Sequence, residues 1–186
     1  METAIGRARR ALAPAGALVA VGVLAAMVVS GQLRESKQFV RFQPAGLMSE
    51  EPAAIDAVEL RAGEGRRRFV RGADGWRAAA GARPLSPSLA AHLDASIKFM
   101  HVSAPVRVME AAEWRPLGLR EFGLDPPAFV ATLYRGNGRV LEAEFGAANP
   151  QQVLQYMKLQ GGDQIYLMSR FIGTEWEACI RESAGG

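Results

Sequence analysis

The side chains of this 186-residue chain with the clearest capacity for chemistry are its two histidines, His92 and His101. An imidazole acts as an acid, a base or a metal ligand when a second polar group lies within reach. The two residues are nine positions apart in a predicted helix, so they differ by about 900° of rotation and point to opposite faces. No Glu-x-x-His or His-x-x-x-His pair occurs in the sequence. We therefore predict surface or rim histidines rather than metal ligands.

Cys179 and Asp125 are two further candidates. Because Cys179 is the only cysteine, an intramolecular disulfide and a cysteine-based metal cage are excluded. A lone thiol on an apolar helix face is typical of a small core residue, and a nucleophile is the alternative. Asp125 precedes two prolines, where turn capping is favoured over acid or base catalysis because no second polar partner is near in sequence.

The sequence contains no glycine-rich phosphate loop, nucleophile elbow, metal-ligand cluster or pair of catalytic carboxylates. We therefore expect no catalytic, metal-binding or cofactor-binding residues and no cofactor. A small-molecule binder or a hydrolase remains the least favoured of the functions considered.

One basic cluster lies in the predicted domain and consists of Arg66, Arg67, Arg68 and Arg71. Such a cluster can contact anionic lipid headgroups or an acidic partner. The alternative is a charged and solvated strand edge that prevents aggregation between strands, and this alternative is favoured.

A second candidate contact surface combines Tyr156 and Lys158 with Tyr166. If their side chains are exposed to solvent, these residues would form an aromatic and cationic patch that a partner could contact. Core tyrosines with one end in water explain the same residues equally well.

The N-terminal segment predicts a cellular location. Residues 1–10 form a basic tail, and residues 11–33 contain no charge over 23 positions, which is enough to cross a hydrocarbon core of about 30 Å. The preceding arginines favour a cytoplasmic N-terminus. A cleaved signal peptide is the main alternative to an uncleaved anchor, and a buried helix of a soluble protein is less favoured. Both membrane-related interpretations place the remaining chain outside the cytoplasm.

The net charge of +3 comes largely from this tail. Three of the 22 basic residues and one of the 19 acidic residues precede residue 34, so the rest of the chain is nearly neutral. A nucleic-acid-binding domain is expected to carry a basic excess of its own, so nucleic acid is not an expected partner.

Residues 34–54 mix charges with Gln, Gly, Pro and Ser and predict a linker. Residues 55–182 predict an α+β domain of antiparallel β-hairpins packed with one or two helices, and residues 183–186 predict a flexible tail. The first strands are expected at 55–60, 66–71 and 76–77. A helix is expected from Pro87, with Ser86 as its N-cap, to about residue 102.

A strand at 105–109 and a short helix at 111–114 should follow. The segment 121–146 then predicts a turn and a β-hairpin whose strands meet at Gly136, Asn137 and Gly138, where the Asn-Gly pair tolerates positive φ. A second hairpin is expected from 153–159 and 164–168, and a helix from 171–180.

The order of Gly123, Leu124, Asp125, Pro126 and Pro127, then a strand, then Phe145-Gly146 and Tyr156 resembles the family labelled domain of unknown function 4340. The resemblance extends over about residues 55–168 and implies a membrane-anchored bacterial envelope protein. Such a protein would have its anchor in the inner membrane and its C-terminal domain in the periplasm. Some members are auxiliary subunits of gliding-type ABC transporters, but this chain has only one copy of the unit.

The motif also has a physical explanation without an activity. Gly123 suits the positive φ that ends a helix, and Leu124 can fold back on that helix. Asp125 and the two prolines hold the chain extended. We therefore predict a non-catalytic accessory or scaffold module that binds a protein in an envelope complex. An auxiliary subunit of an ABC-type transporter is the alternative.

Overall fold

In the computed structural model the chain forms two compact units, Met1–Phe42 and Gln43–Gly186. The structure describes residues 21–22, 25–26 and 46–184. Residues 21–22 and 25–26 are helical and exposed, and the remainder of the predicted tail, span and linker up to residue 45 lies outside the described residues. Among the described residues, no helix combines the length and apolar character required to cross a bilayer.

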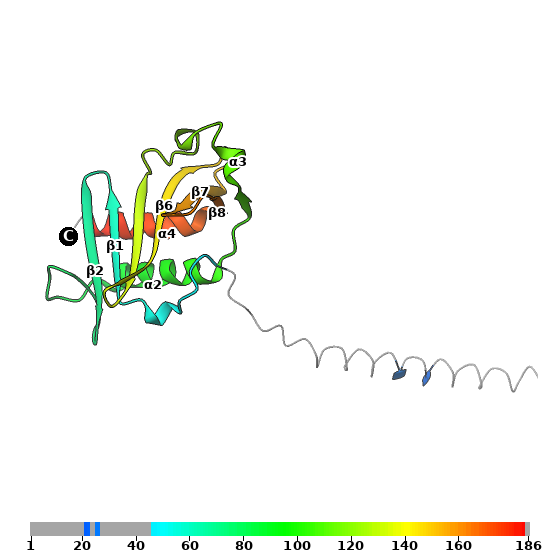
Figure 1. Cartoon of the computed structure of the whole chain (residues 1–186). Helices are drawn as coiled ribbons and strands as arrows, with labels where there is room; N and C mark the ends of the chain where they lie inside the picture. The colour runs from blue at the N-terminus through cyan, green and yellow to red at the C-terminus, as the bar shows by residue number, and fades with distance from the viewer. Residues whose placement is uncertain (1–20, 23–24, 27–45, 185–186) are drawn as a thin grey trace, which may run out of the picture. The chain divides into compact units, whose positions relative to one another are not determined.

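The second unit contains one eight-stranded sheet in which every strand pair is antiparallel. Its strands are β1 (Ala57–Ala62), β2 (Gly65–Gly72), β3 (Gly75–Ala78), β4 (Arg107–Met109), β5 (Phe129–Arg135), β6 (Gly138–Ala148), β7 (Leu154–Leu159) and β8 (Ile165–Ser169). Their order across the sheet is β3-β2-β1-β5-β6-β7-β8-β4. The consecutive strands β3 and β4 therefore lie at opposite edges, and the chain between them crosses the whole sheet (Figure 1).

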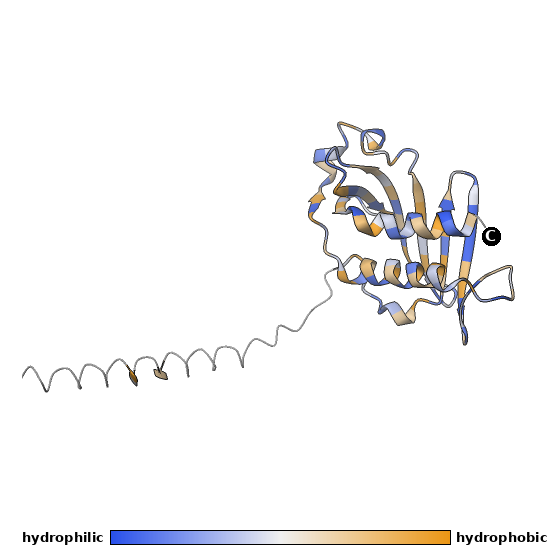
Figure 2. Cartoon of the chain, turned by 180° about the vertical axis from the view of Figure 1, so that it is seen from behind, coloured by the Kyte–Doolittle hydropathy of each residue, from blue (hydrophilic) through white to orange (hydrophobic). Residues whose placement is uncertain are grey.

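Two long helices, α2 (Pro87–Val102) and α4 (Arg170–Ala184), lie side by side on one face of this sheet (Figures 1 and 2). The N-cap of α2 is the predicted one, since the Ser86 side chain accepts a hydrogen bond from the Leu89 N–H and Pro87 opens the helix. Three short helices complete the fold: η1 (Pro52–Ala54), α3 (Ala111–Trp114) and η2 (Leu119–Phe122).

Alternate residues of the central strands form the main core, because successive side chains of a strand point to opposite faces. Val58 on β1 pairs with Phe69 on β2 and with Leu133 on β5, and all three are buried beneath the two helices. A smaller core lies on the opposite face beside β8, where α3 and η2 cover the buried Ile165. Among the described residues, the two long helices thus cover most of one face of the sheet, and the short helices cover the other face beside β8.

This architecture confirms the α+β class and both hairpins predicted from sequence. One detail of the first turn differs. Positive φ occurs at Gly136 (59°), whereas Asn137 and Gly138 do not have positive φ. The glycine is therefore needed at the first position of the turn, as in type II′ hairpins, and not at its Asn-Gly pair.

The predicted domain boundary at residue 55 also differs from the structure. Met48 is buried, and its N–H donates to the Met100 carbonyl while the Gly46 N–H donates to the His101 carbonyl. The last part of the predicted linker is thus packed on α2. At the other end, residues 183 and 184 of the predicted flexible tail belong to α4.

The predicted motif from Gly123 to Pro127 forms a tight corner between η2 and β5. Gly123 has φ of 64°, as predicted, and Leu124 is buried in the smaller core. The Asp125–Pro126 peptide is cis, so this part of the motif is not the simple extended segment expected. Asp125 and Pro126 are exposed, and Pro127 is half-buried.

Candidate functional site

The arginines of the predicted basic cluster lie on β2, and the pleat of the strand divides them between two faces. Arg66 and Arg68 point to the face opposite the helices, where Arg66 Nη2 lies 2.8 Å and Arg68 Nη1 lies 3.9 Å from Oε2 of the buried Glu59. The hydrogen bond to Glu59 raises the pKa of Arg66. Arg67 points to the helical side and donates from Nε to the Ser183 carbonyl oxygen at 3.1 Å.

Arg71 belongs to a separate group. Its Nη2 donates to Asp94 Oδ1 at 2.7 Å, and the same oxygen accepts the Trp76 indole N–H at 2.9 Å. The guanidinium also lies over the Trp76 ring, 4.4 Å from the centroid, and its Nε donates to the Ile55 carbonyl. The four arginines therefore do not form a single basic patch.

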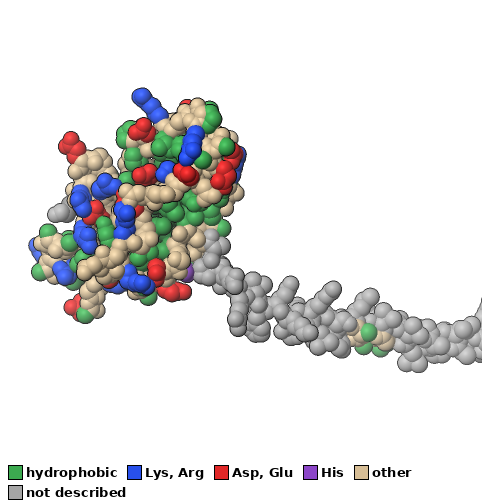
Figure 3. Space-filling view, viewed as in Figure 1, with side chains coloured by type: hydrophobic (Ala, Val, Ile, Leu, Met, Phe, Trp, Pro, Cys, Tyr) green, Lys and Arg blue, Asp and Glu red, His purple; other side chains and the backbone are tan. Residues whose placement is uncertain are grey.

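The face opposite the helices carries a lattice of paired charges over β1, β2, β5 and β6. Glu142 lies 3.1 Å from Arg61 and 2.7 Å from Arg139, in the same way that Glu59 lies between its two arginines. Basic and acidic side chains accordingly alternate on the side of the molecule seen in Figure 3. A shallow polar pocket of about 290 Å³ lies among these groups. Because Glu59 and Glu142 are each paired with arginines, their negative charges are compensated within this face.

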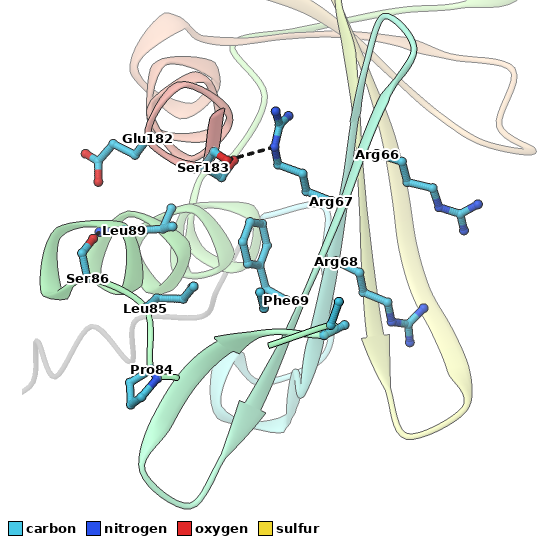
Figure 4. Close-up of a pocket in the computed structure, with 13 residues that line it drawn as sticks. Arg66, Arg67, Arg68, Phe69, Pro84, Leu85, Ser86, Leu89, Glu182 and Ser183 are labelled. Carbon is cyan, nitrogen blue, oxygen red and sulfur yellow. Dashed lines mark hydrogen bonds between the residues drawn. The ribbon is translucent and has the colours of Figure 1, made fainter. Parts of the chain in front are cut away.

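A larger and more apolar groove of about 580 Å³ opens on the other side of β2. It lies between β2, the segment after β3, the first turn of α2 and the end of α4 (Figure 4). Phe69, Leu85 and Leu89 supply apolar side chains to it. The remaining lining residues are Arg66, Arg67, Arg68, Ala78, Ala79, Ala80, Pro84, Ser86, Glu182 and Ser183.

Within the part of the chain that the structure describes, no strand pairs with one half of the β2 edge beside this groove. Strand β3 pairs only with residues 69–72 of β2, so residues 65–68 extend beyond the last strand pair. The Arg68 carbonyl accepts the Ala79 N–H at 2.8 Å. Since peptide groups alternate in direction along a strand, the N–H and C=O of Arg66 face the same outer side as the Arg68 carbonyl. Within the described residues, about half of the β2 edge is therefore open, and the other half is paired with β3.

The groove joins two features that protein-binding modules use. Unpaired strand peptide groups can hydrogen-bond an additional extended segment, and adjacent apolar side chains can receive alternate side chains of that segment. Arg67 and Glu182 add one charge of each sign to its walls. The arrangement is suited to an extended peptide segment.

The predicted patch of Tyr156, Lys158 and Tyr166 is divided between two faces. Tyr156 pairs with Leu167 in the smaller core and contacts Phe122 edge to face at 5.0 Å. Lys158 is half-buried on the same face as Tyr156. Tyr166 points to the helical face, where burial raises its pKa. The three residues do not form one surface.

The two histidines lie apart, as predicted, but only one is at the surface. His92 on α2 places Nδ1 2.6 Å from Glu175 Oε2 and Nε2 3.3 Å from Glu182 Oε1, which links the two helices. His101 is buried, and its Nδ1 lies 3.1 Å from the Met48 carbonyl oxygen. The prediction of a surface histidine was wrong for His101, because residues 46–48 cover the end of α2.

Cys179 is fully buried between α4 and the core, and burial raises its pKa to about 12. The thiol is therefore protonated at neutral pH and is inert toward electrophiles in the folded chain. Within the part of the chain that the structure describes, no three His, Cys, Asp or Glu residues gather as ligands for a metal ion.

Sequence reasoning located β2 but missed most of the groove. Leu85, Leu89 and Glu182 come from segments up to about a hundred residues apart, and no local pattern links them to Phe69. The charge partner Glu59 was also missed, because a glutamate that alternates with apolar residues is typical of any half-exposed strand.

Comparison with protein-family models, with curated proteins and with solved structures found no match for this chain. The resemblance to the domain of unknown function 4340 family stays a prediction from the sequence motif.

Proposed function

We propose that this protein is a membrane-anchored accessory module that binds an extended segment of a partner protein along the open half of β2. The observation that carries this proposal is the edge of β2 around Arg66, which no strand among the described residues covers, beside the apolar groove. An added strand would hydrogen-bond the Arg66 peptide group. Its inward side chains would enter the space beside Phe69, Leu85 and Leu89.

The anchor in this proposal is the uncharged segment 11–33, with the tail 1–10 in the cytoplasm and the α+β domain in the periplasm of a bacterial cell. The helical state of residues 21–22 and 25–26 supports it. Tethering to a membrane raises the effective concentration of a weak binder near its membrane partner, so a modest groove is sufficient for such a role.

A site-specific photocrosslinker tests the groove. We would place it at Ala79, which is exposed and lines the groove, in the full-length protein expressed in cells. The matched control carries it at Ala91, which is exposed on α2 outside the groove. Crosslinked partners would be identified by mass spectrometry of native membranes, and an ATPase or a multi-span permease would assign the module to a transporter.

Strand addition is tested by comparing Arg66→Pro with Arg66→Ala in the Ala79 crosslinker background. Both variants remove the ion pair with Glu59, but only proline removes the outward-facing N–H. We expect the crosslink to survive in Arg66→Ala and to be lost in Arg66→Pro, with both variants folded by denaturant unfolding. Equal crosslinking in the two variants, or equal capture from Ala91, would contradict the proposal.

A further inference from the structure

Most of the large hydrophobic side chains exposed on the described α+β domain gather at one corner. The exposed group on residues 46–184 is Val106, Val108, Leu117, Val153 and Phe171. The backbones of Val106, Val108 and Val153 bond to or pair with residues 166–170, at the junction of β8 and α4. Phe171 follows directly in α4. We call Val106, Val108, Val153 and Phe171, together with the half-buried Phe99, the apolar corner.

Backbone and ring contacts hold the apolar corner together. The Val106 N–H donates to the Leu167 carbonyl at 2.8 Å, and the Val153 carbonyl accepts the Arg170 N–H at 2.9 Å. Val108 pairs with Tyr166 across β4 and β8. Figure 2 shows hydrophobic residues gathered at the ends of α2 and α4 nearest to β4.

Phe171 meets Phe99 of α2 edge to face, with ring centroids 4.9 Å apart. Phe171 is nevertheless 48% exposed, and Val106 is 62% exposed. Their apolar surfaces are therefore left in water by the described part of the chain.

Cationic residues are the neighbours of these apolar residues along the chain. Arg107 lies between Val106 and Val108 in sequence, Lys98 precedes Phe99, and Arg170 precedes Phe171. Arg107 pairs with Glu113, and Arg170 pairs with Glu177, so acidic groups also border the corner. Arg107 points to the opposite face of β4 from Val106 and Val108, so the corner itself presents mainly apolar side chains. Exposed apolar side chains of this kind can enter the headgroup region of a bilayer.

The chain enters the domain beside this corner. The Gly46 N–H donates to the carbonyl of His101, two residues after Phe99 on α2. Only 12 residues separate Gly46 from the end of the uncharged segment at Leu33. Even a fully extended chain of that length reaches only about 40–45 Å. The corner is thus close to the point at which a membrane anchor would be tethered to the domain.

We infer that the apolar corner rests on the lipid surface, with Val106 and Phe171 inserted among the headgroups. This inference depends on the membrane anchor of the proposed function. It leaves the β2 groove, on the far side of the sheet order from β4, available to a partner. Contact with lipid would fix the orientation of the domain above the membrane.

The test uses the full-length protein in vesicles of phosphatidylethanolamine and phosphatidylglycerol. A fluorophore is attached to Val106→Cys, and the matched control carries it at Ala80→Cys, exposed on the segment after β3. Native Cys179 does not compete for the label because it is buried. Lipids with brominated acyl chains should roughly halve the emission at position 106 and leave position 80 unchanged, since interfacial groups lie about 5–10 Å into the headgroup boundary.

Flotation of the same vesicles separates the two ways in which the inference can fail. Protein that floats with the vesicles but shows equal emission at the two positions keeps the anchor and overturns the lipid contact. Protein that does not float overturns the anchor, and the lipid contact with it. Addition of Phe171→Ser should weaken the quenching at position 106 in protein that still floats.

Discussion

A Cβ atom on Gly146 of β6 would collide with the carbonyl oxygen of Phe122, at the end of η2. The same atom would lie 2.9 Å from Cγ of Leu124. The two parts of the predicted motif, which are more than twenty residues apart in sequence, are therefore in direct contact. Gly146 belongs to this motif because the backbone of η2 approaches β6 too closely for any side chain.

Gly146→Ala should destabilise the domain by roughly 3 kcal/mol, because the backbone carbonyl in its way cannot move without distorting the smaller core. The free energy of unfolding in urea measures the effect. Gly138→Ala is the matched control, since its Cβ would meet no atom closer than 3.5 Å and should change stability by only about 0.5 kcal/mol. Equal losses in the two variants would contradict this explanation of the motif.

Gly173 and Gln155 provide a second prediction. A Cβ atom on Gly173 of α4 would collide with Oε1 of the buried Gln155, whose Nε2 donates to the Gly146 carbonyl at 2.9 Å. Gly173→Ala gains about 1 kcal/mol of helix propensity but disrupts a buried amide worth about 1–3 kcal/mol, so we expect a net loss of stability.

The sign of this effect should reverse in a Gln155→Ala background. Once the amide is absent, the nearest remaining atom to an alanine Cβ at position 173 is Nη1 of the flexible Arg170 side chain, at 3.2 Å, so the helix propensity of alanine should stabilise the domain. A double-mutant cycle measures this coupling. The same loss in both backgrounds would show that α4 itself does not tolerate alanine at this position.

Cys179 should be unreactive in the folded protein. Burial raises its pKa from 9.0 to about 12, which lowers the thiolate fraction near pH 8 by roughly a thousandfold. We expect an aromatic disulfide reagent to label the thiol at once in denaturant and very slowly without it. Rapid labelling of native protein would indicate an exposed thiolate.

The same pKa shift predicts a loss of stability at high pH. Above pH 9.0 the unfolded chain loses the thiol proton while the folded chain retains it up to about pH 12, so the unfolded state is favoured as pH rises through this range. The difference in unfolding free energy between wild type and Cys179→Ala should therefore shift against wild type between these two pH values. A difference that is constant with pH would contradict burial of the thiol.

Glu113 should give an opposite dependence at low pH. The Glu110 backbone N–H, and then Arg107, lower the pKa of Glu113 in the α3 capping box. Its ionised form therefore stabilises the fold above the ordinary carboxyl value of 4.5, and this contribution is lost as pH falls through the lower folded pKa. Thermal unfolding of Glu113→Gln as a function of pH should converge with wild type in acid.

Arg107→Gln is the partner control for this prediction. It removes the second cause of the shift but leaves the Glu110 N–H in place, so part of the acid dependence should persist. Complete loss of the dependence in Arg107→Gln would assign the shift to the ion pair alone.

The sequence by itself determined those features that depend on neighbouring residues. The cap at Ser86 and the short helix at 111–114 depend on local φ and ψ preferences and on hydrogen bonds within a few residues. The hairpin turn is equally local, although its positive φ lies at Gly136 and not at the predicted Asn-Gly pair. The alternation of Val58 and Leu60 likewise places the core face of β1, since the period of a strand is fixed by its pleat. The uncharged run at 11–33 is also local, and its membrane role stays a prediction.

Only the tertiary structure decided which of these elements lie together. β1 pairs with β5, about seventy residues later, and this pairing fixes Glu59 at the centre of the charge lattice. The burial of His101 and the groove beside Phe69 likewise arise from segments that are remote in sequence. Such contacts depend on the mutual fit of whole surfaces and on the closure of long loops, and no short pattern of residues encodes either one.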